Sequence, residues 1–314
     1  MIDGKSLKSR IRITLTYMII IMLGLLCLIP LWNMVCYSFS AAVAIQQNKV
    51  ILYPVDFTLV AYEKILSDKQ FWTSFGISVL RVILSVVINV VLIVLTAYPL
   101  SHTDKEFRGR NVYMGLVLFA MLFSGGMVPG FLLVNKLKLV NTIWALVLPS
   151  AVPIFSVVMV MNFFKGIPKT LEEAAMIDGA SPIRIMAQIY VPCAKPAIAT
   201  VALFSIVSNW NDFMSGMLYM TKRSKYPIMT YIQSLRVNIR ELLETGASAE
   251  ELTHAATLSG MNLSAAKIVV AVIPLLLIYL LKFLLKFPLL EHLSVSLKHL
   301  LVHLLIKYLG HLLM

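Results

Sequence analysis

The residues best suited to chemistry lie in two polar stretches of a chain that is otherwise mostly apolar. The first stretch, residues 168–192, reads PKTLEEAAMIDGASPIRIMAQIYVP. Its carboxylates offer charge to a cationic partner, and its alanines let another surface approach closely. We therefore predict a protein-docking element, with a helix lying on the membrane surface as the alternative. The residues of the predicted contact are Glu172, Glu173, Ala174, Ala175, Asp178 and Gly179.

The second polar stretch, Asn209, Trp210, Asn211 and Asp212, interrupts an apolar segment. Amides and a carboxylate supply the donors and acceptors that sugar hydroxyls need, and an indole can stack on the apolar face of a sugar ring. These four residues are therefore candidates for lining a substrate pathway. The alternative is that the two asparagines join neighbouring helices by hydrogen bonds, each worth around 1 kcal/mol.

Motifs for catalysis and metal binding are not found in the sequence. No G-x-x-x-x-G-K-[ST] phosphate loop occurs, so we expect this chain not to hydrolyse ATP. No Ser/His/Asp set and no pair of carboxylates stands out within the apolar segments. The cysteines, Cys27, Cys36 and Cys193, lack metal-ligand spacing. The chain is therefore expected to be a non-catalytic protein with no cofactor and no metal of its own.

Local sequence signals predict two short helices within residues 168–192. Thr170 and Glu173 have the spacing of a capping box, which would start the first helix. Gly179 can adopt the left-handed conformation that ends a helix. Ser181, followed by proline, is expected to cap the second helix, and Pro192 is expected to end it. The predicted helices span residues 171–178 and 182–192.

Composition predicts an all-α membrane protein. The chain is 59% hydrophobic and only 13% charged, whereas soluble domains carry about 25% charged residues. Because about 20 residues cross the hydrocarbon layer, six apolar runs are long enough to span it. The net charge of +12 is expected to lie beside lipid headgroups, with no nucleic-acid partner. The predicted transmembrane helices are Leu15–Cys36, Ser74–Pro99, Asn111–Val134, Thr142–Phe164, Ala197–Met220 and Ala265–Leu285.

Charge at the N-terminus predicts its side of the membrane. Lys5, Lys8, Arg10 and Arg12 precede the first apolar run, which places the N-terminus in the cytoplasm by the positive-inside rule. A cleaved signal peptide is the competing interpretation. It is disfavoured because the run 13–39 is much longer than the roughly 7–15 residues of a signal core.

Two features within the predicted spans have both a structural and a functional interpretation. Arg81 lies near one end of the second span, where it is expected to reach out to the lipid headgroups. Ser124-Gly125-Gly126, in the third span, can serve close helix packing, or it can break the helix where the backbone lines a cavity.

The spacing within residues 168–192 also carries a resemblance. Glu173-Ala174-Ala175, three residues, Gly179, nine residues, Ile189, one residue and Val191-Pro192 resemble the EAA loop of ABC-importer permeases, E-A-A-x3-G-x9-I-x-L-P. Val191 in place of leucine is the single departure. The segments NFFKGIPKTLEEAAMIDGAS and SNWNDF resemble the MalG-like carbohydrate permeases, especially their LplC/YtcP-like group. The resemblance covers residues 11–279.

The resemblance implies a fold and a function. The fold would be a type-1 importer transmembrane domain of six helices with a cytoplasmic coupling helix. The chain would be a multi-pass permease subunit in the plasma membrane of a prokaryote, importing a sugar or oligosaccharide. Its partners would be a second permease subunit, two cytosolic ABC ATPases that bind ATP-Mg, an extracellular solute-binding protein and membrane lipids. The loop 221–264 would meet the binding protein.

The resemblance fails at the C-terminal end, which defines three expected regions. Residues 1–70 hold the N-terminal segment, first span and external loop; residues 71–285 form the permease core; residues 286–314 form an atypical amphipathic tail. An altered reading frame would equally produce such a tail. Two other functions stay open: a secondary transporter, which would need an intramembrane ionisable residue, and a membrane scaffold that moves no solute.

Overall fold

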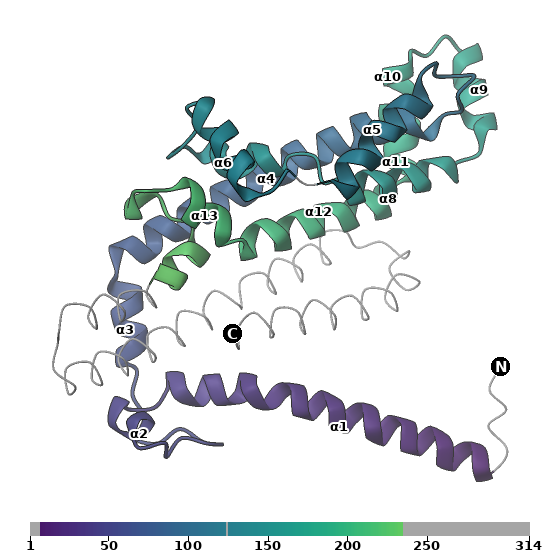
Figure 1. The fold of residues 1–314 in the computed structure, drawn as a ribbon. Helices are drawn as coiled ribbons and strands as arrows, with labels where there is room; N and C mark the ends of the chain where they lie inside the picture. The colour runs from purple at the N-terminus through teal and green to yellow at the C-terminus, as the bar shows by residue number, and fades with distance from the viewer. Residues whose placement is uncertain (1–6, 124, 235–314) are drawn as a thin grey trace. The chain divides into compact units, whose positions relative to one another are not determined.

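The computed structural model describes residues 7–123 and 125–234, and these belong to two compact units whose boundary along the chain falls between Ser67 and Asp68. Figure 1 shows the ribbon of the chain. In these residues the regular elements are helices, and the β pairing is a single antiparallel bridge between Ser40 and Phe57. The predicted all-α class is therefore confirmed. The predicted sixth span, the tail 286–314 and most of the loop 221–264 lie outside the described residues.

The first unit contains a long apolar helix followed by two short ones. Large apolar side chains in the middle of the long helix, from Leu15 to Ile29, are exposed, as expected for a helix surrounded by lipid. After this helix the chain folds back, because the Ser38 and Tyr62 hydroxyl groups lie 2.9 Å apart. The ring of Phe39 also stacks on that of Tyr62. The helices are α1 (Leu7–Ser38), α2 (Ala42–Gln46) and α3 (Val60–Ser67).

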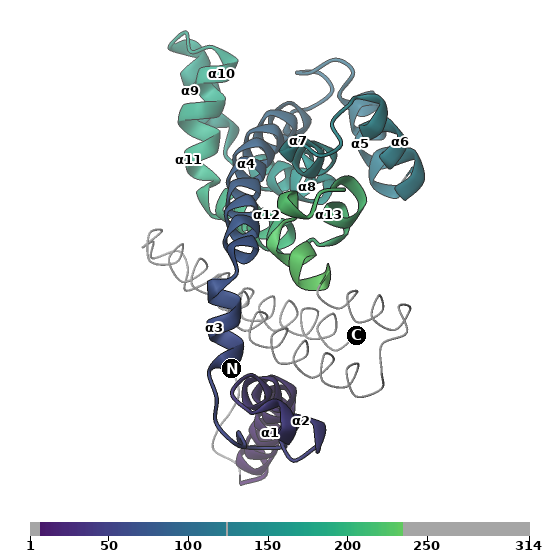
Figure 2. The ribbon, with the colours of Figure 1, turned by 90° about the vertical axis from the view of Figure 1, so that its left-hand side faces the viewer.

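The second unit is organised around α4, which packs along both α8 and α12. The two ribbon views show these three helices side by side (Figures 1 and 2). The short helices α9 and α10 lie at one end of this group, and α13 lies toward the other. The elements in order are α4 (Lys69–Ser101), α5 (Arg110–Leu122), α6 (Met127–Lys136), α7 (Ile143–Val147), η1 (Leu148–Ser150), α8 (Ile154–Lys165), α9 (Lys169–Ile177), α10 (Pro182–Ile185), the π-helical η2 (Met186–Tyr190), α11 (Val191–Cys193), α12 (Lys195–Asn211), α13 (Met214–Tyr219) and η3 (Arg223–Lys225).

Helix α4 buries one stripe that changes character along its length. Asp68 caps the helix by accepting a hydrogen bond from Gln70 N at 2.8 Å. The buried positions recur every three or four residues, as helical periodicity requires. Toward the N-terminal end they are largely polar, whereas from Ile93 onward they are apolar and join the core formed with α8 and α12. The polar positions are Ser74, Ser78, Arg81, Ser85 and Asn89.

Among the described residues, two helices are long and apolar enough to cross a membrane alone, Thr14–Ser38 and Lys69–Ser101. Three bent helix pairs raise the number of candidate spans to as many as five. The first five predicted spans each overlap one of these candidates. The bends measure 113° between α5 and α6, 48° between Ile143–Ser150 and α8, and 82° between Pro182–Cys193 and α12.

The third predicted span is broken at its glycines. Helix α5 ends at Leu122, α6 begins at Met127, and Gly126 has a φ of +84°. This conformation is strained for residues with a Cβ but open to glycine. The sequence allowed either close helix packing or a helix break at these glycines, and the backbone shows the break.

The start of α9 corrects one local prediction. The helix begins at Lys169, after Pro168, and no side chain caps it. Thr170 is therefore already inside the helix, so the predicted capping box with Glu173 is wrong. The prediction for Gly179 is confirmed by its φ of +74°. Ser181 caps α10 as predicted, because its Oγ accepts a hydrogen bond from Arg184 N at 3.4 Å.

Pro192 shapes the second helix before the chain turns. A proline ring clashes with the carbonyl four residues earlier and supplies no N–H. The helix accommodates Pro192 by the π-helical turn η2 immediately before it, and continues through α11 to Cys193. The end therefore falls one residue beyond the prediction. The π turn ends at Tyr190, which is buried.

Substitution of Gly216 tests the packing of α13. A Cβ at this position would lie 2.0 Å from Thr230 Oγ1 and 2.9 Å from Thr230 Cβ. We expect Gly216→Ala to cost about 1–3 kcal/mol of stability through overpacking, measured as a lower Tm of the detergent-solubilised protein. Gly76→Ala is the control, since a Cβ there meets nothing within 4 Å. Equal Tm values for the two variants would contradict this packing.

Candidate functional site

The predicted docking residues on α9 divide between two faces of the helix. Glu173, Ala174, Asp178 and Gly179 are exposed. Ala175 is half-buried and packs against the core formed by α4 and α8. Glu172 is buried, with 9% of its surface exposed. Two adjacent glutamates therefore point to different surroundings, one outward and one toward the end of α4.

Glu172 uses both carboxylate oxygens in contacts with other elements. Oε1 lies 2.8 Å from His102 Nε2, and His102 is the residue that caps the C-terminal end of α4. Oε2 accepts a hydrogen bond of 2.5 Å from the Tyr190 hydroxyl, in η2. The Tyr190 ring meets Tyr98 and Phe164 edge-on at 5.1 and 5.4 Å. Glu172 thus joins three elements that are distant in the sequence.

A second, exposed ion pair holds the start of α9. Lys169 Nζ lies 2.6 Å from Glu106 Oε1, in the loop that follows α4. The hydrogen bond from Lys169 and a second one from the Thr103 backbone lower the pKa of Glu106 to about 2. The same hydrogen bond raises the pKa of Lys169. A cleft of about 400 Å³ lies beside this pair and is lined by His102, Arg110 and Glu172 among others.

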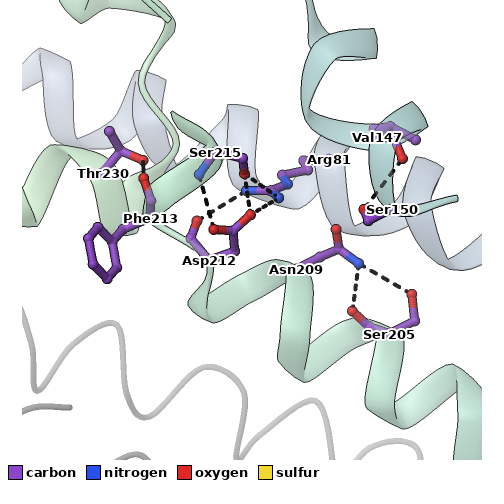
Figure 3. Close-up of polar contacts among 9 residues, drawn as sticks. All are labelled: Arg81, Val147, Ser150, Ser205, Asn209, Asp212, Phe213, Ser215 and Thr230. Atoms are coloured by element: carbon purple, nitrogen blue, oxygen red, sulfur yellow. Dashed lines mark hydrogen bonds and ion pairs between the residues drawn. The ribbon is translucent and has the colours of Figure 1, made fainter. Parts of the chain in front are cut away.

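At the other end of α4, an ion pair buries Arg81. Only 2% of Arg81 is exposed, and its Nη2 lies 2.5 Å from Asp212 Oδ2. Nη1 donates to the Asp212 backbone carbonyl at 3.1 Å, and Nη2 donates to Ser215 Oγ at 2.9 Å. Figure 3 shows these groups converging between α4, the end of α12 and the start of α13. The expectation that Arg81 reaches the headgroups is wrong, because Asp212 and Ser215 bind its two terminal nitrogens inside the protein, while Nε has no partner among the described residues.

Asn89 links three elements in the middle of the polar stripe. In the amide orientation that satisfies its neighbours, its Nδ2 donates to Ser85 O at 2.9 Å and to Ala151 O at 3.0 Å. Its Oδ1 accepts from Ser205 Oγ, on α12, at 2.9 Å. Asn209 in turn donates to Ser205 O at 2.9 Å, within its own helix (Figure 3). The amides therefore serve helix contacts in this part of the molecule.

The four predicted pathway residues occupy different environments. Trp210 is 1% exposed, and its ring meets that of Phe75 edge-on at 5.9 Å. Asn209 is buried, and Asp212 is paired with Arg81. Asn211 is half-buried, and its Oδ1 has no hydrogen-bond partner among the described residues. Trp210 Nε1, a donor, is likewise buried without a partner among the described residues, and Asn211 Oδ1 is the acceptor of this stretch in that position.

Sequence reasoning missed His102, Tyr190 and Ser215 as parts of these clusters. His102 and Glu172 are 70 residues apart, and no local pattern marks such a pair. Tyr190 lies within the EAA-like stretch, but no local pattern marks its contact with Glu172, which is 18 residues away. No group of three or more His, Cys, Asp or Glu side chains that could hold a metal ion occurs in the described part of the chain.

Comparison with known proteins agrees with this helical architecture. Residues 81–287 match the family described as "Binding-protein-dependent transport system inner membrane component". The polygalacturonan/rhamnogalacturonan transport system permease protein YtcP of Bacillus subtilis is 36% identical over 87% of this chain and 94% of its own length. Protein LplC of the same organism is 34% identical, over 82% and 85% respectively.

A solved structure also resembles this chain. The crystal structure of a bacterial ABC transporter involved in the import of the acidic polysaccharide alginate contains a chain with 30% identity. The similarity covers 88% of this chain and 99% of that chain, with a TM-score of 0.74.

These findings define an integral membrane component of an ABC-type importer. The chain belongs to the family of binding-protein-dependent transport system inner membrane components. It is a permease of the bacterial inner membrane, a non-catalytic subunit of a system whose ATP is bound by other chains. Because the chain belongs to this family, the alternatives of a secondary transporter and of a membrane scaffold are set aside.

Removing Asp212 tests the buried ion pair. Asp212→Leu leaves the Arg81 guanidinium buried without its counter-charge, and we expect a loss of up to about 3 kcal/mol in stability. The measurement is the detergent Tm of Arg81→Leu, of Asp212→Leu and of the double variant Arg81→Leu/Asp212→Leu, which removes both charges and should recover part of the loss. A double variant as unstable as the sum of its single variants would show that the pair is not coupled.

Proposed function

We propose that this chain forms the translocation pathway of an ATP-driven sugar or oligosaccharide importer and is coupled to its ATPase through α9. The complete subunit would have six transmembrane helices and a cytoplasmic N-terminus. It would work with a second permease subunit, two cytosolic ATPases and an extracellular solute-binding protein. Residues 71–285 would form the transporting core, with 1–70 leading into it and 286–314 as an amphipathic addition.

The observation that supports coupling through α9 is the composition of the exposed face of the α9–α10 segment. Large apolar side chains are strongly exposed there, with Ile177 at 86% and Ile183 at 74%. Glu173 and Asp178 lie exposed beside them. Exposed apolar residues beside polar ones mark protein-interaction surfaces. The segment follows directly on the core helix α8, so a protein that grips it would act on the membrane helices.

The names of similar proteins support a carbohydrate as the solute. YtcP is named for polygalacturonan and rhamnogalacturonan, and the solved transporter imports alginate. Within 209–212, we assign solute contact to Asn211, because its half-buried amide has an acceptor that no described residue uses. Trp210 and Asp212 would instead shape the pathway indirectly, by holding α12 against α4, and Asn209 would do so through its hydrogen bond within α12.

Two substitutions on α9 test the coupling proposal. Gly179→Val introduces a β-branched residue at a φ of +74°, which strains the backbone by about 1–3 kcal/mol. Glu173→Lys reverses an exposed charge. We expect both variants to insert in the membrane but to lose ATP-dependent uptake, and Glu173→Lys to lose co-purifying ATPase.

The matched control for Gly179→Val is Gly115→Val, at a helical glycine of α5 with open space around it. This variant should transport like wild type. If Gly179→Val and Glu173→Lys also transport like wild type, α9 is not the coupling site.

Solute contact by Asn211 is tested by kinetics. We expect Asn211→Ala to raise KM for uptake, or to change the preference between neutral and uronate oligosaccharides, without lowering Tm. Asn209→Ala should instead leave KM unchanged and lower Tm, because it removes a hydrogen bond within α12 and not a solute contact. Unchanged kinetics in Asn211→Ala would remove this residue from the pathway.

A further inference from the structure

The two adjacent glutamates of α9 lie in different surroundings, and the buried one faces the protein interior. Glu173 is exposed on the face that carries the apolar side chains. Glu172 lies on the inner face, with one oxygen on His102 and the other on Tyr190. A buried carboxylate costs free energy unless it is paired and hydrogen-bonded. A role for Glu172 must therefore explain why both oxygens are engaged.

The hydrogen-bond partners of His102 and Glu172 determine how many protons their contact requires. His102 Nδ1 lies 2.9 Å from the Tyr98 carbonyl oxygen, which can only accept, so Nδ1 carries a proton. Glu172 Oε2 already accepts from Tyr190. The contact of 2.8 Å between His102 Nε2 and Glu172 Oε1 then requires one more proton between them. Such a charge-assisted bond is stronger than a neutral one.

We propose that Glu172, His102 and Tyr190 form a polar tether that transmits the movement of α9 to α4. Glu172 is a positioning residue in this account: it does not meet the ATPase, but fixes α9 to the end of a membrane helix. The inference rests on the proposed coupling role of α9 and adds the route by which displacement leaves it.

The residues around the tether connect it to long helices, which favours transmission of movement from α9 to α4 over a contact with only local effect. His102 directly follows α4, a continuous helix of 33 residues. The same helix carries Arg81, whose ion pair with Asp212 fixes the end of α12. Tyr190 is wedged among Tyr98, Phe164 and the His102 ring. A displacement of Glu172 would therefore be transmitted to the rigid helix α4 through His102. Through Tyr190 it would also be transmitted to the segment that leads into α12.

The geometry can be tested on the full chain without its partners. The native cysteines are replaced by alanine, and spin labels are attached at Met176→Cys on α9 and Leu95→Cys on α4. Double electron–electron resonance then measures the distribution of distances between the two labels. We expect Glu172→Ala to broaden this distribution. Glu172→Gln should keep it narrow, because the amide can donate to a neutral His102 and still accept from Tyr190. Glu173→Gln is the control on the exposed face and should also leave it narrow.

Transmission is tested in the assembled importer in proteoliposomes. Losing the tether should lower uptake per ATP hydrolysed by about tenfold in Glu172→Ala while the ATPase stays bound. Glu172→Gln should remain near wild type. Tyr190→Phe removes only one hydroxyl, so a smaller loss is expected; this variant decides the question if Glu172→Ala does not fold.

The outcomes separate the tether from the coupling proposal. A narrow distance distribution in Glu172→Ala, or undiminished uptake per ATP in that variant or in Tyr190→Phe, would overturn the tether. Loss of the bound ATPase from Glu172→Ala would also overturn it, since the residue would then serve docking. If wild type itself binds no ATPase, the coupling proposal fails, and the spin-label distances still report on the tether.

Discussion

The polar side chains of α4 impose the constraint on which the second unit depends. A polar group in an apolar helix must find its partners within the protein, because lipid offers none. Arg81 pairs with Asp212, Asn89 forms hydrogen bonds with Ser205 and Ala151, and His102 contacts Glu172. These partners lie on or beside α12, just before α8, and on α9. Satisfying one helix therefore fixes α12, the start of α8 and α9 relative to it, and apolar packing then fills the space between.

This arrangement connects the two ends of the transporting unit. The Asp212 end carries the residues that we relate to the solute, and the Glu172 end carries the proposed ATPase contact. Between them α4 runs unbroken, whereas several neighbouring segments are bent or interrupted. A rigid helix among bent ones is suited to carry a displacement, since the bends absorb the change in shape. Two-state movement of this kind is how a nucleotide and a loaded binding protein can bias access.

Local signals predicted the features that depend on a few neighbouring residues. Gly179 takes its left-handed conformation and Ser181 caps its helix, because each follows from short-range geometry. Apolar run length likewise placed five segments where candidate spans occur. The capping box failed because Pro168 starts the helix before Thr170. The burial of Arg81 and Glu172 could not be predicted, since their partners are 131 and 70 residues away. The EAA-like spacing grouped Glu172 and Glu173 in one predicted contact and did not distinguish the buried glutamate from the exposed one.

The most direct measurement is a structure of the assembled importer by electron cryo-microscopy, with ATPase and binding protein present. The account predicts that α9 lies in a groove of the ATPase, with Glu173 facing the groove and Glu172 still bonded to His102 and Tyr190. An ATPase that contacts another segment, or a Glu172 side chain that faces the ATPase, would contradict it.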